Sequence, residues 1–500
     1  MQMKNEVRSN VVINLIRTVT MMILSFVTFP LVCRYLGDTM VGLYSWATAF
    51  VYYFLILARI SIPNIAVREC IKVRDDPDKL AHKTQEFFII QAVTTLLSFG
   101  LMCVIVFASG IENFVATNQK DLIKPLIFIL SLNFLSGVLS FEWIFTALEK
   151  HTYMAIRSII VATVVDILVF AFIKDPEHIL LYAFLSILTT VLTVVSNLVY
   201  LPRLVKFRRT EKYNFKQYFP LLGILFAISV VVAIYDKTDT FILGFIDPSK
   251  ASVGSYSVAM KGVEIVIGII TALSTIFMPR AMYYYQKGDE RQFRNLNKYS
   301  ANICLLIVIP AIALMVALAE PITKIIAGTE GYYFADTILI ALASLMLTFS
   351  LSNIIYTQIL IPLKKEKFYL IAVLSAALTN IGLSLLFGLV IFKDNPAFGV
   401  ALGTAITDLL LLSILASFSW KESKHIIFNI NNLKILIIGI VIGVASYFLS
   451  PLLLNVLLNS MTIEFAYLLD IVIIFFGSLI VYAIGLIISK EKLIQSIIHK

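Results

Sequence analysis

The sequence predicts an all-α integral membrane protein of about fourteen transmembrane helices, in two pseudo-symmetric six-helix lobes around a central cavity plus a C-terminal helix pair. Three observations predict this fold class. Of the 500 residues, 59% are hydrophobic and only 14% are charged, whereas an ordinary soluble domain carries about 25% charged residues. A helix needs about 20 apolar residues to cross a bilayer, and apolar runs of this length recur along the whole chain. A turn motif from the first half of the chain also returns in the second half.

The apolar runs are helices because every backbone polar group in lipid must be paired within the protein. The alternating segments of about ten residues that would indicate a membrane β-barrel are missing from the sequence. The first run is too long for a signal-peptide core and precedes no small-residue cleavage site, so we expect a retained helix. The predicted spans, in order, are 11–33, 41–67, 86–109, 124–147, 153–173, 179–201, 217–246, 253–278, 299–319, 333–361, 369–392, 398–420, 434–457 and 465–488.

Lysine and arginine are distributed unequally between alternate loops, which predicts the orientation of the helices. With the N-terminus inside, the inner segments hold 28 of the 40 lysine and arginine residues and the outer segments hold 7. Cytoplasmic loops of membrane proteins carry this excess. We therefore predict a multi-pass cell-membrane protein with both termini in the cytoplasm. Its basic inner surface would face anionic lipid headgroups, and no nucleic-acid partner is expected.

The repeated motif supports two related halves. Val41-Gly42, Tyr44-Ser45 and Ala47 recur as Val253-Gly254, Tyr256-Ser257 and Ala259, in both cases at the junction of an odd-numbered span with the next. Chance similarity between apolar segments is the alternative explanation. Six crossings per half would make the two halves a parallel repeat about an axis normal to the membrane. The expected domains are an N-lobe, 1–216, a C-lobe, 217–433, and a helix pair with a cytoplasmic tail, 434–500.

Charged residues inside the first two spans predict a substrate cavity. A charge in mid-bilayer costs from about 2.5 to well above 10 kcal/mol, so it needs a partner or a water-filled space. Arg17 lies on a polar helical stripe with Asn14, and Tyr52 shares a face with Arg59 seven residues later. We predict that these four residues contact the substrate near the inner leaflet. Arg157, in the fifth span, is expected to snorkel to the inner interface.

The seventh and eighth spans carry a second group of charges. Asp236 and Asp239 share one face of their helix while Lys237 points elsewhere, and Lys261 and Glu264 lie on one stripe of the next helix. Asp236 and Lys261 are at similar depth and could pair. We predict Lys261 as a further cavity cation and the other four as ion-coupling or salt-bridge candidates. A closed salt-bridge network and the lining of a cavity that opens both remain open.

Other chemistry is not indicated by the sequence. Asp166, near the middle of the fifth span, is one more coupling candidate without a partner that the sequence identifies. The histidines and cysteines show no metal-ligand spacing, and no P-loop motif occurs. No loop exceeds about twenty residues, so a soluble catalytic domain is excluded. We expect a protein that is not an enzyme and has no cofactor or metal, with Na⁺ or H⁺ coupling or the membrane potential as its energy source.

Several segments resemble those of a known family, the polysaccharide repeat-unit flippases, which are Wzx-type transporters of the multidrug/oligosaccharidyl-lipid/polysaccharide exporter superfamily. The segments that carry the resemblance are Arg34 to Tyr44, Ala58 to Arg68, Gln358 to Glu366, and Asn380 with Phe398 to Ala405. The family often has an acidic residue near the end of the twelfth helix, for which Asp408 is the candidate here.

The resemblance implies two six-helix lobes that alternate between inward-open and outward-open states. The implied cargo is an undecaprenyl-pyrophosphate-linked oligosaccharide, moved from the inner to the outer leaflet for synthesis of a cell-surface polysaccharide. Arginine forks match pyrophosphate oxygens well, so Arg17 and Arg59 are expected to receive the headgroup. Membrane lipids, a polysaccharide polymerase and chain-length machinery are the implied partners.

Three rival functions remain open at this point. A flippase for lipid II, the peptidoglycan precursor, would carry a similar anionic lipid. A cation-coupled drug exporter of the MATE type would favour an acidic cavity, which five intramembrane cations argue against. A membrane enzyme acting on lipid-linked sugars would need larger outer loops than this sequence contains.

Overall fold

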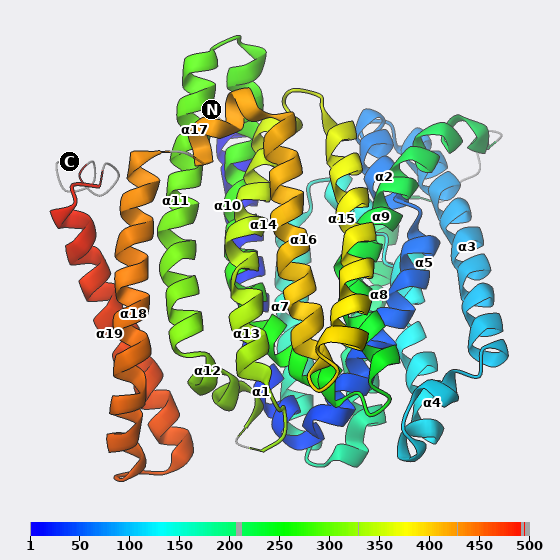
Figure 1. Ribbon diagram of the computed structural model, residues 1–500. Coiled ribbons are helices and arrows are strands. Elements are labelled where there is room, and N and C mark those ends of the chain that lie inside the picture. Colours follow the sequence, from blue (N-terminus) through cyan, green and yellow to red (C-terminus); the bar gives the residue numbers. More distant parts are fainter. Residues whose placement is uncertain (1, 207–212, 329, 428, 492–494, 496–500) are drawn as a thin grey trace. The chain divides into compact units, whose positions relative to one another are not determined.

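The computed structural model describes residues 2–206, 213–328, 330–427, 429–491 and 495, and within them the chain forms helices and no strand (Figure 1). This confirms the all-α membrane fold. The described residues contain twelve candidate membrane spans. The first of these, Ile16–Lys72, has 57 residues, enough for two crossings of about 20 residues each. Together with the apolar 28-residue helix α9 (Phe219–Ile246), these segments accommodate about fourteen crossings.

The chain divides into two compact units, residues 1–253 and 254–500. In the first unit, α1 packs against α3, α7 and α9, α2 packs against α6, and α7 packs against α8. The lobe boundaries expected from the repeat stay a prediction. The helices of this unit besides α9 are α1 (Gln2–Arg59), α2 (Ile62–Lys72), α3 (Pro77–Ala108), α4 (Lys120–Ser131), α5 (Phe134–Leu139), α6 (Glu142–Ala147), α7 (His151–Phe172) and α8 (Ile179–Tyr200), with short 3₁₀ turns at Ile111–Phe114, Thr117–Gln119, Pro176–His178, Leu201–Arg203 and Phe215–Gln217.

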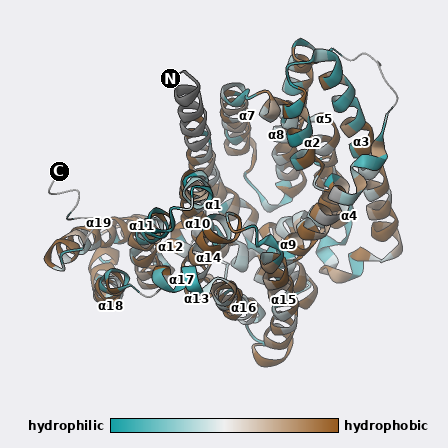
Figure 2. Cartoon of the chain, turned by 90° about the horizontal axis from the view of Figure 1, so that it is seen from above, coloured by the Kyte–Doolittle hydropathy of each residue, from teal (hydrophilic) through white to brown (hydrophobic). Residues whose placement is uncertain are grey.

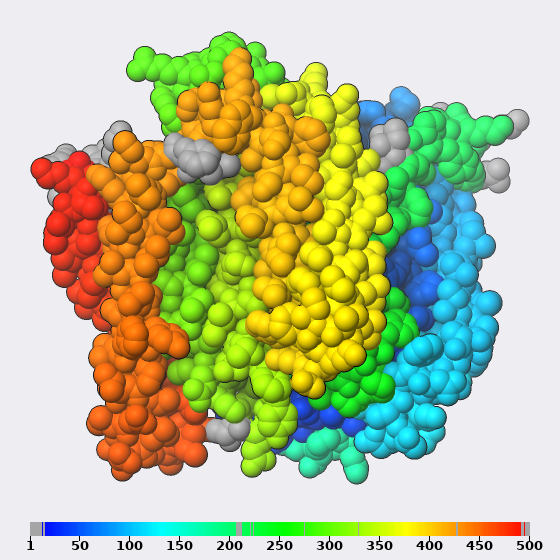
Figure 3. Space-filling model, in the orientation of Figure 1, coloured from blue at the N-terminus to red at the C-terminus, as the bar shows by residue number. Residues whose placement is uncertain are grey.

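In the second unit α11 packs along α18, α15 along α16, and α18 along α19. Figure 3 shows α18 and α19, in orange and red, lying next to each other. The helices are α10 (Ala251–Gln286), which begins at the boundary of the two units, α11 (Glu290–Ala317), α12 (Ala319–Ala327), α13 (Ala335–Ala343), α14 (Leu345–Ile354), α15 (Glu366–Leu386), α16 (Pro396–Phe418), α17 (Trp420–Ile427), α18 (Ile430–Leu458) and α19 (Ile463–Ile488), with π-helical segments at Ile355–Leu360 and Phe387–Ile391.

Kinks and breaks in the first unit depart from the continuous spans that the sequence predicts. Helix α1 joins the first two spans across a kink at Gly37, whose φ of 75° is readily adopted only by glycine. The second span breaks again after Arg59, where Ile60 and Ser61 have positive φ. The predicted span 124–147 is divided into α4, α5 and α6, with positive φ at Phe141. These breaks place backbone ends and polar side chains within segments that were expected to be regular.

Hydrophobic side chains cover the outer faces of many helices, as expected of a surface that meets lipid. Leu96 and Leu97 on α3 are 71% and 70% exposed, and Phe448 on α18 is 68% exposed. Figure 2 shows hydrophobic residues along the helices and hydrophilic ones at α17. Since water would disfavour so much exposed apolar surface, the pattern agrees with a multi-pass membrane protein.

Two G-x-x-x-G motifs, Gly399 with Gly403 and Gly439 with Gly443, lie where helices approach closely. A Cβ on Gly439 of α18 would come within 2.2 Å of the Ile309 side chain of α11, and one on Gly399 of α16 within 2.7 Å of the Phe387 carbonyl oxygen. Small residues permit such contacts between membrane helices.

Candidate functional site

Arg59 is the last residue of a helix that ends within an apolar segment. The carbonyl oxygen of Ala58 would lose its helical partner at this break, but it accepts hydrogen bonds from Gln91 Nε2 at 2.9 Å and from Thr94 Oγ1 at 2.6 Å. Ser98 Oγ donates to the Phe54 carbonyl at 2.6 Å. All three donors belong to α3. The break is therefore built into the fold, because side chains replace the lost backbone bonds away from water.

The guanidinium of Arg59 reaches a second broken helix. Its side chain is exposed, and Nη2 donates to Ser136 Oγ on α5 at 3.2 Å. The chain then breaks at Ser140 and Phe141, so Glu142 becomes the first residue of α6. A carboxylate at a helix N-terminus is stabilised by the helix dipole. The segment 134–147 thus presents Ser136 to Arg59 and, directly after its own break, Glu142 to another arginine.

That second arginine is Arg157 of α7, and it is buried. Its Nη2 lies 2.6 Å from Glu142 Oε1, and its Nη1 donates to Asn197 Oδ1 of α8 at 2.5 Å. Asn197 in turn donates to the carbonyl oxygen of Ser140 at 2.5 Å. The expectation that Arg157 snorkels to the interface is wrong, because the broken helix supplies an internal carboxylate that the sequence pattern could not place.

Arg17 belongs to the same group of charges. Its side chain is partly buried on α1, attracted by Glu142 and repelled by Arg157. We call Arg17, Arg59, Arg157 and Glu142 the arginine cluster. Segment 134–147 contacts both Arg59 and Arg157, and its Glu142 attracts Arg17. The cluster has three cations and one anion, a net formal charge of about +2. Asn14, predicted beside Arg17, has a side chain outside the described residues.

Charges of α9 adjoin Tyr52, which the sequence had grouped only with Arg59. Lys237 Nζ lies 5.7 Å from the centre of the Tyr52 ring and 3.4 Å from an oxygen of Asp236. Tyr52 also interacts electrostatically with Arg59 and Asp236. Asp239, one turn further along α9, is buried. Tyr52 therefore lies between the arginine at the helix break and the acidic residues of α9, within one unit.

The remaining predicted residues have other neighbours. In the second unit, Lys261 Nζ lies 3.7 Å from Glu264 of the same helix. A pairing of Lys261 with Asp236 would join the two units and stays a prediction. In the first unit, Asp166 on α7 lies beside Thr28 of α1.

Asp408 is buried in α16 and accepts a hydrogen bond from Thr348 Oγ1 of α14 at 3.2 Å. The described residues contain no group of three or more His, Cys, Asp or Glu side chains that could hold a metal ion.

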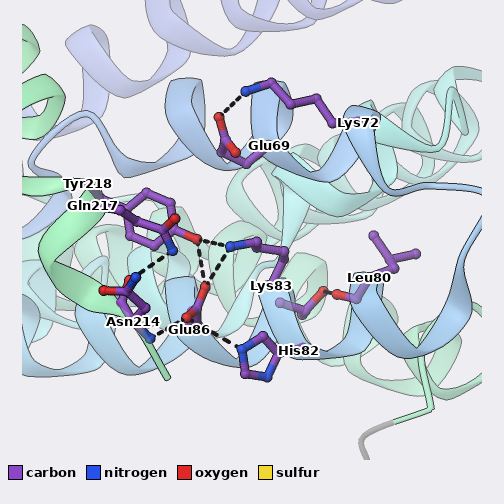
Figure 4. Close-up of polar contacts among 10 residues, drawn as sticks. Glu69, Lys72, Leu80, His82, Lys83, Glu86, Asn214, Gln217 and Tyr218 are labelled. Atoms are coloured by element: carbon purple, nitrogen blue, oxygen red, sulfur yellow. Dashed lines mark hydrogen bonds and ion pairs between the residues drawn. The ribbon is translucent and has the colours of Figure 1, made fainter. Parts of the chain in front are cut away.

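Sequence reasoning missed a buried polar cluster that positions the start of α9 (Figure 4). Glu86 of α3 is fully buried and accepts hydrogen bonds from the Asn214 backbone N–H at 2.7 Å and from Tyr218 Oη at 2.6 Å. Lys83 Nζ lies 3.1 Å from the same carboxylate, and His82 Nε2 lies 3.5 Å from it. Glu86 was assigned to the beginning of a span with no partner, although the i, i+3 spacing with Lys83 was a usable signal.

Two family models match the chain. One described as "Polysaccharide biosynthesis protein" matches residues 7–282, and one described as "MatE" matches residues 214–386.

The chain is 22% identical over 413 residues to the "Putative O-antigen transporter" of Escherichia coli (strain K12), covering 79% of this chain and 92% of that protein. It is 27% identical over 154 residues to the "Probable lipid II flippase MurJ" of Rickettsia prowazekii (strain Madrid E), covering 31% and 30%.

Solved structures show the same fold. Lipid II flippase MurJ in an inward closed conformation matches with a TM-score of 0.72 and 22% identity, covering 96% of this chain and 99% of that one. An inward-facing multidrug resistance MATE family transporter of the MOP superfamily matches with a TM-score of 0.61 and 12% identity, covering 81% and 98%. The likeness confirms the predicted fold class.

Proposed function

The chain belongs to the polysaccharide biosynthesis protein family, and we propose that it flips undecaprenyl-pyrophosphate-linked oligosaccharide repeat units from the inner to the outer leaflet. The movement serves the synthesis of a cell-surface polysaccharide and proceeds by alternating access. The arginine cluster is the observation that carries the proposal. A drug exporter for cations would have no use for three arginines beside a single carboxylate.

The headgroup of such a lipid fits the cluster by charge and by hydrogen-bond geometry. A pyrophosphate diester carries about two negative charges, each phosphoryl oxygen accepts charge-assisted hydrogen bonds, and guanidinium forks donate them in pairs. Arg59 is exposed at a helix break and Arg17 is only partly buried, so both side chains are accessible to a ligand. Tyr52 and the α9 charges would border the same space. The oligosaccharide would occupy the aqueous part, and the lipid tail would stay in the bilayer.

The energy source follows from the charge of the cargo. An anion that leaves a negative cytoplasm gains about 2.3 kcal/mol per charge for every 100 mV. Coupling to Na⁺ or H⁺ through Asp236, Asp239 or Glu264 is the alternative within this proposal. Flipping that persists without either ion gradient but stops when the potential is removed would exclude such coupling.

The test is leaflet exchange in liposomes. Purified protein would be reconstituted with a fluorescent undecaprenyl-pyrophosphate oligosaccharide, with an inside-negative or a zero potential. We expect Arg17→Ala and Arg59→Ala to reduce flipping at least tenfold, because each removes a guanidinium from the headgroup site. Arg74→Ala is the matched control, since Arg74 forms a surface pair with Glu149 at 2.8 Å. Normal flipping by Arg59→Ala would contradict the assignment.

Two other cargoes are tested in the same liposomes. The fold similarity to lipid II flippase MurJ makes lipid II the second candidate, and preferential flipping of lipid II over the oligosaccharide lipid would favour it. Export of a cationic dye without any flipping would favour a drug exporter. We also propose that both termini lie in the cytoplasm and that the protein associates with a polysaccharide polymerase and chain-length machinery.

A further inference from the structure

The two side chains of the Glu142–Arg157 ion pair differ in burial, and this difference points to exchange of the carboxylate for another anion. The side chain of Arg157 is 4% exposed, whereas that of Glu142 is 41% exposed. A partly exposed carboxylate can leave an ion pair at low cost because water solvates it, but a buried arginine cannot remain without a counter-ion. Arg157 also has a buried Nε that makes no hydrogen bond within the described part of the chain.

Glu142 acts on more than one arginine. It attracts Arg17 on α1, whereas Arg157 repels Arg17. The carboxylate therefore screens two guanidinium groups that would otherwise repel each other. Its position at the N-terminus of α6, directly after the break at Phe141, leaves it on a six-residue helix. Trp143, Ile144 and Phe145 of α6 are buried, so the carboxylate would leave Arg157 by rotation of its own side chain and not by movement of the helix.

We infer that Glu142 is an internal competitor of the anionic headgroup, which neutralises Arg157 and Arg17 in the empty site and is displaced when a pyrophosphate group binds. This rests on the proposed function and extends it, because it assigns a specificity and release role to a residue outside the predicted site. Displacement exchanges one negative charge for about two, which favours pyrophosphate over a singly charged phosphate ester. Return of Glu142 then helps to release the product.

The experiment measures anion binding separately from flipping. Binding of inorganic pyrophosphate to the detergent-purified full chain would be followed by calorimetry at fixed salt. We expect Glu142→Gln to lower the dissociation constant about tenfold, the scale of one charge interaction at a partly exposed site. The same variant should flip the oligosaccharide lipid more slowly, because release is impaired. Glu149→Gln, the exposed partner of Arg74, is the matched control and should leave both values unchanged.

A second variant tests whether Arg59 belongs to the anion site. Ser136→Asp places a new carboxylate beside Arg59 and leaves the Glu142–Arg157 pair intact, so pyrophosphate binding should weaken about tenfold. If Glu142→Gln does not fold, as judged by thermal unfolding, Glu142→Asp replaces it, because its shorter side chain withdraws the carboxylate from Arg157 and should also tighten pyrophosphate binding. Unchanged pyrophosphate binding in the folded Glu142 variant would overturn the inference.

Different results would contradict the proposed function and the competitor role of Glu142. If the wild-type protein flips the oligosaccharide lipid but Glu142→Gln binds pyrophosphate no more tightly, the competitor role is wrong and the function stands. If the wild-type protein does not flip the lipid while Glu142→Gln still binds pyrophosphate more tightly, the anion site stands and the function is wrong.

Discussion

At the residue scale, buried charged side chains in this protein are stabilised by different kinds of partner. Arg157 has a carboxylate and an amide as partners. Lys250, which is fully buried in the turn after α9, has backbone carbonyls instead. Its Nζ donates to Phe114 O at 2.5 Å and to Gly244 O, and lies 4.3 Å from the centre of the Trp46 ring. Carbonyl dipoles and an aromatic face replace part of the lost hydration.

The burial of Lys250 has a consequence for pH dependence. Burial lowers its pKa from 10.5 to about 8, against the opposing attraction of Asp247. Between these two pH values the unfolded chain holds the proton and the folded chain has released it. The unfolded state then binds more protons, so raising the pH favours the folded state, by up to about 3 kcal/mol for the whole shift.

We therefore predict that the slope of stability against pH differs between the wild-type protein and Lys250→Met. As the pH rises from about 8 to 10.5, the wild-type protein should gain stability relative to the variant, because only the wild type has this titrating group. Thermal unfolding in detergent at several pH values measures the effect. Parallel stability curves for the two proteins would show that burial does not lower the pKa of Lys250.

At the element scale, helix breaks determine where the polar groups lie. α1 ends at Arg59 and α6 begins at Glu142, so two members of the arginine cluster stand at helix ends. Basic side chains at a C-terminus and acidic ones at an N-terminus interact favourably with the helix dipoles. Side chains of α3 bind the exposed carbonyls at the first break. The arginine cluster thus lies at breaks in the backbone, and the regular helix α3 stabilises the first of these breaks.

The packing of α9 against α1 depends on one small residue. Trp46 Nε1 donates to the Phe241 carbonyl at 3.3 Å, and its ring meets Phe245 edge-on at 5.4 Å. A Cβ on Gly244 would lie only 2.0 Å from Trp46 Cδ1. No flexible end of a side chain stands there, so the indole or the helix would have to move.

We predict that Gly244→Ala lowers stability by about 1 to 3 kcal/mol, the usual cost of overpacking. Gly223→Ala on the same helix is the control. A Cβ there meets no atom within 4 Å, and alanine is the better helix former. Thermal unfolding of both variants in detergent would make the comparison. Equal stability of the two variants would contradict the close approach of α9 and α1.

At the scale of the whole molecule, the lysine and arginine distribution predicts which ends of the helices face the cytoplasm. Single cysteines can test it, because Cys33, Cys70 and Cys304 are buried and Cys103 is partly buried. We expect an impermeant maleimide to label Asp394→Cys in whole cells and Lys287→Cys only after the membrane is opened. Both positions are exposed and lie in turns of the second unit. The reverse labelling pattern would invert the proposed topology.

The sequence by itself determined the fold class, the approximate spans and the family. Hydrophobic run length is a local property, and the energy of exposing polar backbone to lipid allows only helices in such runs. The sequence also identified Arg17, Arg59 and Tyr52 as unusual, because a charge or polar group within an apolar run is visible without any structure.

Only the tertiary structure decided which residues are partners. Arg157 meets Glu142, and Lys250 meets a set of backbone carbonyls. The breaks at Ile60–Ser61 and at Phe141 were not predicted, since positive φ in non-glycine residues depends on contacts that stabilise an unfavourable conformation. Pairing and breaks arise from residues distant in the chain, and a pattern read along one helix does not contain them.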